Sequence, residues 1–264
     1  ETLLEYIYIY IYIYNMRHRI KLIIALVIAL ALALYLVKPF ESFLSSQPKI
    51  HLITQFYVPD NEDRKKEIVT CLENNINNKY IDKIILFVEK DYDELIKYND
   101  PKITLVKTLD RLSFKMAFEY ANTHISINED VIYVLANSDI YYDDTIIKLY
   151  EYNFDKNVLA LTRIEEIKNN KPVYFHTPSY SQDTWIWKNN ITIKDTYDDY
   201  NKDGIIMGIR GCDNRIAYII QDSGYDIKNK YKLINTVHLH KNDYRPWVEK
   251  PGYGAPHKYF TSEY

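Results

Sequence analysis

The sequence predicts a single α/β domain over residues 49–264, built on a mainly parallel sheet with helices on both faces. Two observations lead to this fold class. Short apolar runs rich in Ile and Val, typical of buried strands, recur along the chain. Segments with apolar residues at helical spacing separate several of these runs. One long hydrophobic segment is present, and it precedes the predicted domain.

The predicted strands are short and almost entirely apolar, as strands covered on both faces are. Because helices alternate with them, parallel pairing is expected. In such a sheet the ligand site lies beyond the carboxyl ends of the strands. The five runs are Ile50–Phe56, Ile84–Val88, Ile103–Val106, Val131–Leu135 and Val158–Leu161.

Two helices are predicted between these strands. In residues 63–76, Ile68, Cys71, Leu72 and Ile76 fall on one helix face. The spacing recurs between the third and fourth strands, at Phe114, Ala117, Phe118 and Ala121.

Beyond residue 170 the alternation is less regular. Short segments around Trp185, a helix over residues 213–223 and a strand over residues 233–240 are expected there. Since neither a linker nor an internal repeat separates this part, we interpret it as the second half of the same domain.

Composition excludes several classes of protein. The 264 residues carry 33 Lys and Arg against 36 Asp and Glu, a net charge of −3, which argues against binding to polyanions. The first of only six glycines is Gly204, so a P-loop and a Rossmann fingerprint are both excluded. Cys71 and Cys212 are too few for a disulfide scaffold, although a pairing between them stays open.

Residues 1–15 form a low-complexity Tyr-Ile tract. Strict Tyr-Ile alternation is what a translated T/A dinucleotide repeat gives, and we expect Met16 to be the initiator and the tract a leader. The alternative is an exposed segment with a strong tendency to form a β-strand.

Residues 16–38 are predicted to be an uncleaved signal anchor. The uncharged run 22–37 spans about 24 Å as a helix, somewhat short of the roughly 30 Å hydrocarbon core, which suits a thin early secretory membrane. The alternative is a cleaved signal peptide, but no Ala-x-Ala site follows. Residues 39–48 would form a stem.

The charges around this segment predict its orientation. Arg17, Arg19 and Lys21 precede the apolar run, which places the N-terminus in the cytosol. We therefore expect a single-pass type II membrane protein with its domain in the Golgi or ER lumen, or, in another host, at a viral or bacterial membrane. The sequon at Asn190 is compatible with a luminal domain.

The fourth predicted strand leads directly into Asn137, Ser138 and Asp139. An acidic residue at the ligand edge of a sheet needs a cationic partner, so Asp139 is a candidate ligand for Mg²⁺ or Mn²⁺. The alternative is a turn, followed by a helix capped from Asp143 onward.

Three further places carry polar side chains suited to chemistry. Asp213 precedes an apolar helical stripe and is a candidate N-cap, a candidate general base, or both. His238 and His240 share a strand face, as metal ligands or as partly exposed polar residues. Asp183 stands beside Trp185, whose ring could stack on a sugar or fill the core.

Six blocks of sequence follow one another in a distinctive order. They are Arg111-x-x-Phe114 to Asn122, Ala136 to Asp143, Ala160 to Arg163, Ser181 to Ile186, Gly211 to Ala217, and His238-Leu239-His240 with Arg245. In this order they resemble glycosyltransferases of the GT-A fold, related to the family 2-like enzymes. The resemblance covers roughly residues 50–245.

The resemblance implies an enzyme that transfers a sugar from a nucleotide-sugar donor to a hydroxyl of a glycan, protein or lipid. It places Asn137-Ser138-Asp139 where the family has the Asp-x-Asp motif that holds Mn²⁺ or Mg²⁺ on the diphosphate. Asn137 stands in the place of the first acid of that motif, so Asp139 is its one carboxylate here. His238 or His240 would complete the metal shell.

The resemblance also implies roles for residues around the donor and acceptor. Asp213 lies where inverting members keep the base that deprotonates the acceptor. Asp110 and Arg111 occupy donor-side positions, and Gln55 ends the first strand where the nucleotide would lie. Asp183 would contact sugar or acceptor, and Trp185 the sugar.

Two other functions remain open at this point. One is an inactive glycan-binding or scaffold protein of the same fold, which the single acid Asp139 favours. The other is a sugar nucleotidyltransferase, which is disfavoured because the first strand leads into VPDNEDRKK and not into a Gly-rich loop.

Overall fold

The computed structural model describes residues 2–45, 47–90, 95, 98–125, 129–168, 171–175, 181–240 and 252–260. Its residues form two compact units, Glu1–Gln47 and Pro48–Tyr264. The site described below belongs entirely to the second unit.

The first unit is the helix α1 (Thr2–Ser45). The Tyr-Ile tract is therefore helical and the β-strand alternative for it is wrong: a lone strand leaves its backbone N–H and C=O groups unpaired, whereas a helix pairs them within the segment. Within the described part of the chain, no helix is both long enough and apolar enough to span a membrane.

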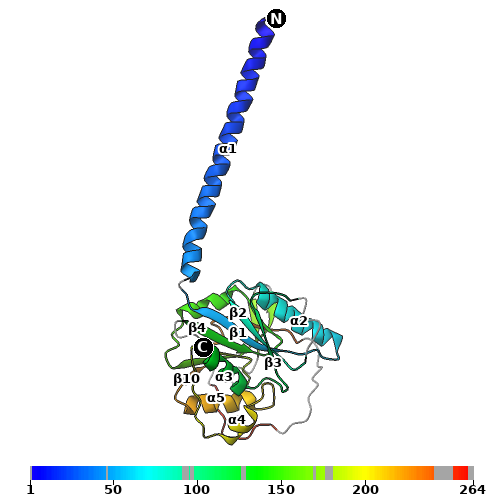
Figure 1. The fold of residues 1–264 in the computed structure, drawn as a ribbon, viewed down its shortest axis with the longest axis vertical. Helices are drawn as coiled ribbons and strands as arrows, with labels where there is room; N and C mark the ends of the chain where they lie inside the picture. Colours follow the sequence, from blue (N-terminus) through cyan, green and yellow to red (C-terminus); the bar gives the residue numbers. More distant parts are fainter. Residues whose placement is uncertain are drawn as a thin grey trace. The chain divides into compact units, whose positions relative to one another are not determined.

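The second unit is built on a seven-stranded sheet (Figure 1) with the order β10-β6-β9-β4-β1-β2-β3. All adjacent pairs are parallel except those of β9, which runs antiparallel between β4 and β6. The mainly parallel sheet and all five predicted strands are confirmed. The strands are β1 (Lys49–Phe56), β2 (Lys83–Val88), β3 (Ile103–Lys107), β4 (Val131–Ala136), β6 (Asn157–Leu161), β9 (Thr184–Lys188) and β10 (Asp226–Lys228).

Helices cover both faces of this sheet (Figure 1), as expected. On one face, α3 (Phe114–His124) and α5 (Cys212–Asp222) pack into a core that includes Ile53, Tyr133 and Trp185. On the other lies α2 (Glu62–Asn77), whose buried residues include the predicted Ile68, Cys71 and Leu72. A 3₁₀ helix, η2 (Asp144–Glu151), and a short α4 (Asp198–Asp203) complete the unit.

The two cysteines do not form a disulfide. Cys71 on α2 and Cys212 on α5 are both buried and both free. They belong to helices on opposite faces of the sheet, so the pairing that the sequence left open is excluded.

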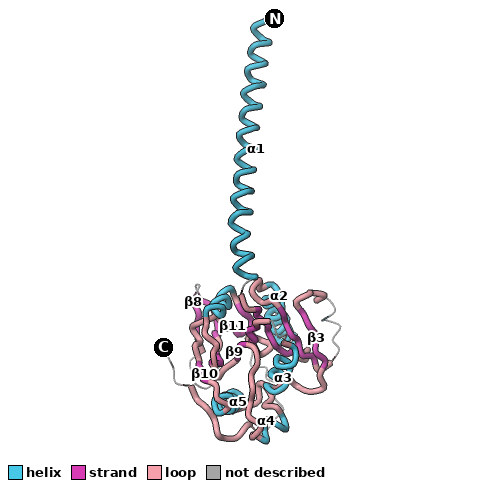
Figure 2. The backbone as a smooth tube through the Cα atoms, turned by 60° about the vertical axis from the view of Figure 1, so that its left-hand side comes forward, coloured by secondary structure: helices cyan, strands magenta, loops and turns pink. Residues whose placement is uncertain are grey.

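A second, four-stranded sheet, in which β8 and β11 are labelled in Figure 2, was not predicted. Its order is β5-β11-β7-β8. The strand predicted over residues 233–240 is shorter than expected, because only the part paired with β5 and β7 is extended. The strands are β5 (Ile140–Tyr142), β7 (Ile164–Lys168), β8 (Lys171–Tyr174) and β11 (Thr236–His238).

Asn75 of α2 fixes the first strand of this sheet. Its Nδ2 donates to the carbonyl of Ile140 at 2.9 Å, and its Oδ1 accepts from the backbone N–H of Tyr142 at 3.1 Å. Since His238 pairs with Ile140 across the ladder, the second sheet brings the end of β11 next to the segment that follows β4. The site is assembled at this junction.

Candidate active site

One cavity of about 930 Å³ opens beyond the carboxyl ends of β1 and β4, where the sequence places the ligand site. It contains most of the predicted site residues, brought from positions far apart in the chain. Those that line it are Gln55, Arg111, Asn137, Ser138, Asp139, Asp183, Asp213, His238 and His240.

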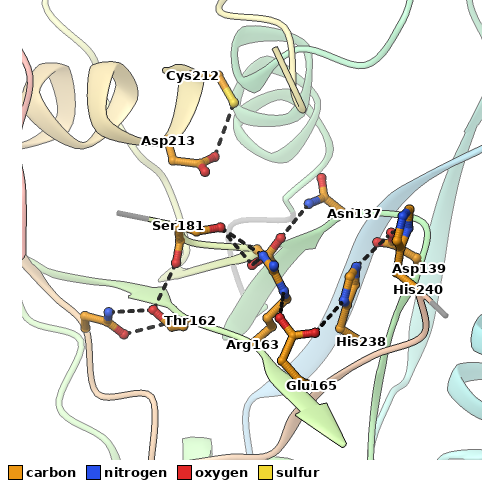
Figure 3. A network of polar contacts seen from close by, with 12 residues as sticks. Asn137, Asp139, Thr162, Arg163, Glu165, Ser181, Cys212, Asp213, His238 and His240 are labelled. Atoms are coloured by element: carbon orange, nitrogen blue, oxygen red, sulfur yellow. Dashed lines mark hydrogen bonds and ion pairs between the residues drawn. The ribbon is translucent and has the colours of Figure 1, made fainter. Parts of the chain in front are cut away.

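Asp139, His238 and His240 form a compact cluster at one side of this cavity (Figure 3), with one ligand atom from each within 4.8 Å of the others. His238 Nε2 lies 3.1 Å and His240 Nδ1 3.8 Å from Asp139 Oδ2. The two imidazole rings are stacked, with nearly parallel planes and centroids 5.4 Å apart, so both side chains lie on the same side of the chain.

The donor atoms of this cluster suit a divalent cation. Asp139 Oδ1 and His240 Nε2 are buried and have no hydrogen-bond partner among the described residues, and His238 Nε2 faces Asp139 Oδ2. Burial opposes ionisation of Asp139, but hydrogen bonds from both histidines and the charge of a nearby arginine hold its pKa well below the usual range. A deprotonated carboxylate beside two imidazoles is a metal-ligand set, and it offers three protein ligands with further positions for substrate.

Arg64 already supplies one positive charge to Asp139. Its Nη2 lies 2.5 Å from Asp139 Oδ2, and its Nη1 donates to the carbonyl of Leu239 at 3.2 Å. Sequence reasoning missed this residue. The available signal was its position one turn before Ile68 on the apolar face of α2, where a charged side chain needs a buried partner.

Asp183 lies at the start of β9, farther along the cavity. Its Oδ1 accepts from Asn137 Nδ2 at 3.1 Å, and its Oδ2 accepts from Arg163 Nη1 at 3.0 Å. The Arg163 guanidinium also stacks on the ring of Phe175, at 4.2 Å from the centroid. Arg163 stands in one of the resembling blocks, but sequence reasoning gave it no role.

Asp213 lies in the first turn of α5 and lines the same cavity. The prediction that it is the N-cap is wrong: Gly211 occupies that position with φ +79°, and a side chain there would crowd the carbonyl of Tyr253. The Asp213 carboxylate instead accepts from Cys212 Sγ at 3.2 Å.

The ionised form of Asp213 is disfavoured in the folded chain. Burial, and next the negative charge of Asp183, raise its pKa from 3.8 to about 7. A carboxylate with a pKa near neutrality is a far better proton acceptor than an ordinary one, so Asp213 has the property that a general base needs.

Of the residues predicted to lie on the nucleotide side, Gln55 and Arg111 line the cavity. Gln55 ends β1, where its Oε1 accepts from the N–H of Leu112 at 3.1 Å and its Nε2 donates to Glu89. Arg111 lines the cavity from an exposed position. Arg245 lies outside the described residues.

Two predicted site residues do not line the cavity. Asp110 is exposed on the loop after β3. Trp185 is wholly buried against Phe114, edge to face at 5.1 Å, so its predicted contact with a sugar is wrong and the core alternative holds. The antiparallel strand β9 turns this side chain toward α3, away from the cavity.

No protein family and no curated protein matches this sequence. Chains of solved structures do match it. A mannosyltransferase from Pyrobaculum calidifontis in complex with GDP-Man and Mn²⁺ is 15% identical, with 76% of this chain and 60% of that chain covered and a TM-score of 0.47. GalNAc-T7 with UDP, GalNAc and Mn²⁺ is 9% identical, with 78% and 45% covered and a TM-score of 0.48.

A 4-diphosphocytidyl-2C-methyl-D-erythritol synthase from Anaerococcus prevotii is 16% identical, with 69% of this chain and 86% of that chain covered and a TM-score of 0.39. The matched part spans less than two thirds of the mannosyltransferase and of GalNAc-T7. At these identities and TM-scores the similarities carry no conclusion about the fold family or the activity of this chain.

Proposed function

We propose that this protein is a metal-assisted glycosyltransferase that transfers a sugar from a nucleotide-sugar donor to a hydroxyl of a glycan, protein or lipid. One observation carries the proposal. A single cavity holds a carboxylate with two imidazoles, Asp139, His238 and His240, together with an aspartate, Asp213, whose pKa is about 7. Transfer from a diphosphate donor to a hydroxyl needs these two capabilities, charge neutralisation and proton abstraction.

Asp139, His238 and His240 would hold the metal on the donor side. A bound Mn²⁺ or Mg²⁺ there supplies positive charge to the leaving diphosphate. Two imidazole ligands favour Mn²⁺, because Mg²⁺ prefers a shell of oxygen atoms. The cationic side chains of Arg111 and Arg210 line the same cavity and can bind diphosphate oxygens.

Asp213 and Asp183 would act on the acceptor side. Asp213 takes the proton from the acceptor hydroxyl, and its raised pKa matches that task. Asp183, held by Asn137 and Arg163, is fixed in orientation and can accept a hydrogen bond from a sugar or acceptor hydroxyl.

The test is release of nucleoside diphosphate from a panel of nucleotide sugars by the full chain, with Mn²⁺, Mg²⁺ or EDTA. We expect release from one donor, lost with EDTA and in Asp139→Asn. Asp213→Asn should still bind that donor but turn it over slowly, whereas Asp203→Asn, at an exposed position on α4, should behave as wild type. Folded protein that neither binds nor hydrolyses any donor would contradict the proposal.

A second candidate is a binding protein of the same fold that does not turn over a donor. The observation in its favour is the Arg64–Asp139 ion pair, which gives Asp139 a cation without any metal, together with Asn137 in place of a first acid. This candidate predicts that a glycan or nucleotide sugar binds equally well with and without EDTA, and that no nucleoside diphosphate is released.

We also propose that residues 16–38 anchor the protein in a secretory membrane as a type II protein, with residues 1–15 a leader, 39–48 a stem and 49–264 the catalytic domain. The basic residues before the apolar run and the exposed position of Asn190 support this topology. In secretory cells, alkaline extraction should leave the protein in the membrane pellet, and Asn190→Gln should lower its mass on gels. Release by alkaline buffer would contradict it.

A further inference from the structure

The second sheet brings a fourth side chain to the candidate metal cluster. β7 pairs with β11, with Ile164 opposite Val237, so the next residue on β7, Glu165, lies beside His238. Glu165 Oε2 is 3.6 Å from His238 Nδ1, and Figure 3 shows the two side chains facing each other. No sequence motif pointed to Glu165.

The two ring nitrogens of His238 face two different carboxylates. Nε2 lies 3.1 Å from Asp139, whereas Nδ1, buried and without a hydrogen-bond partner among the described residues, has Glu165 on its side. A histidine that binds a metal through one nitrogen commonly donates its other N–H to a carboxylate, which fixes the tautomer and the ring. Glu165 is in the place for that role.

Arg163 holds Glu165 from the opposite side. Its Nε lies 2.8 Å from Glu165 Oε1, while its Nη1 lies 3.0 Å from Asp183 Oδ2. One guanidinium therefore joins a carboxylate beside the metal cluster to a carboxylate on the acceptor side. With a side chain 13% exposed and stacked on Phe175, Arg163 has little freedom to move.

We propose that Glu165 is a positioning residue, which orients His238 so that Nε2 is the nitrogen presented to a divalent cation, and that Arg163 holds Glu165 and Asp183 in one arrangement. The metal end and the acceptor end of the cavity are thereby mechanically linked. This inference rests on the proposed function in one respect, the binding of a divalent cation at Asp139, His238 and His240.

The test measures Mn²⁺ affinity without any substrate, from the loss of the free-Mn²⁺ electron paramagnetic resonance signal as the full chain is added. Glu165→Ala should raise the dissociation constant about 10- to 100-fold, the usual effect of removing such a partner. Glu165→Gln should raise it less, because an amide oxygen still accepts from Nδ1–H. Glu151→Ala, at an exposed position on η2, is the matched control and should leave it unchanged.

Arg163→Met tests the link to the acceptor side. We expect a rise in the Mn²⁺ dissociation constant although Arg163 is no ligand, with the thermal midpoint of each variant recorded to show that the chain is folded. If folded Glu165→Ala binds Mn²⁺ as tightly as wild type, the proposed role of Glu165 is overturned. If folded Arg163→Met binds Mn²⁺ as tightly as wild type, the proposed link between the metal end and the acceptor end of the cavity is overturned. Absence of Mn²⁺ binding in wild type would overturn both this inference and the metal dependence of the proposed function.

Discussion

Asp213 is a carboxyl group whose ionised form is unfavourable in the folded chain. It is half-buried beside Asp183, so its ionised form is disfavoured and its pKa in the folded chain is about 7 against an ordinary 3.8. A group with a raised folded pKa binds its proton more tightly when the chain is folded. Its stabilising contribution is therefore complete below about pH 4 and is lost as the pH rises through about 7.

Asp213→Asn should accordingly stabilise the protein in mildly alkaline solution. We expect a gain on the order of 2 kcal/mol at about pH 8 and a much smaller change at about pH 4, because the asparagine cannot ionise. Urea unfolding at both pH values measures this. An equal change in stability at the two pH values would contradict a raised pKa at this position.

The same titration predicts the pH dependence of turnover. As a base, Asp213 acts only when deprotonated, so the rate should rise with pH through about 7. Asp213→Asn should lower the rate about a hundredfold or more and remove this limb of the profile. A rising limb that persists in the variant would assign it to another group.

Arg64 and Asp139 form an ion pair between side chains only 8% and 9% exposed. Arg64→Met leaves a buried carboxylate without this cation, and we expect a loss of about 3 kcal/mol in the free energy of unfolding. Lys66→Met on the same helix breaks an exposed pair with Asp63 and should cost less than about 1 kcal/mol. Both losses are measured by urea unfolding. Equal losses would mean that the buried Arg64–Asp139 pair stabilises the fold no more than the exposed Lys66–Asp63 pair does.

At the scale of elements, the site depends on how α2 holds β5. The side chain of Asn75 satisfies two buried backbone groups of β5, and β5 in turn pairs with β11, which carries His238. A strand of three residues has few contacts of its own, so its position is set by these partners.

Asn75→Ala should therefore affect both stability and the site. Loss of two buried hydrogen bonds should cost about 2–4 kcal/mol, and Mn²⁺ affinity should fall as β5 and β11 shift. Asn74→Ala is the matched control, since that side chain is exposed and its bond is within its own helix, to the carbonyl of Thr70. Calorimetry and Mn²⁺ titration of both variants measure the effects, and similar results for the two would contradict this role of Asn75.

At the scale of the whole molecule, the candidate metal cluster joins distant parts of the chain. Asp139 and His238 are 99 residues apart, so a bound cation would link the segment after β4 to the end of β11. Only the folded chain brings these ligands together, and binding must then stabilise the folded state.

Saturating Mn²⁺ should raise the thermal midpoint. At a free concentration about 100 times the dissociation constant the gain is about 2.7 kcal/mol, which corresponds to roughly 5–10 °C for a domain of about 150–250 residues. EDTA should reverse it, and Asp139→Asn should abolish most of it. A midpoint insensitive to Mn²⁺ in scanning calorimetry would contradict a metal site.

Patterns along the chain were sufficient for five of the seven strands of the main sheet and for the helices on its faces, because burial of strands such as Val131–Leu135 and the helical spacing of Ile68, Cys71 and Leu72 follow directly from local periodicity. The same reasoning placed Asp139 at the ligand edge of the sheet. It failed for β5 and β7, which are too short or too polar to show a period and exist through pairing with β11.

Tertiary contacts decided the rest of the site. Trp185 suits a sugar platform and a core equally well by residue type, and only the direction of β9 turned it toward α3. Arg64, Arg163 and Glu165 acquire their partners from segments up to 175 residues distant or from a neighbouring strand, so no local pattern marks them. The pKa of Asp213 likewise depends on its burial and on the charge of Asp183. Both result from folding, and the residues next to Asp213 in the sequence do not reveal them.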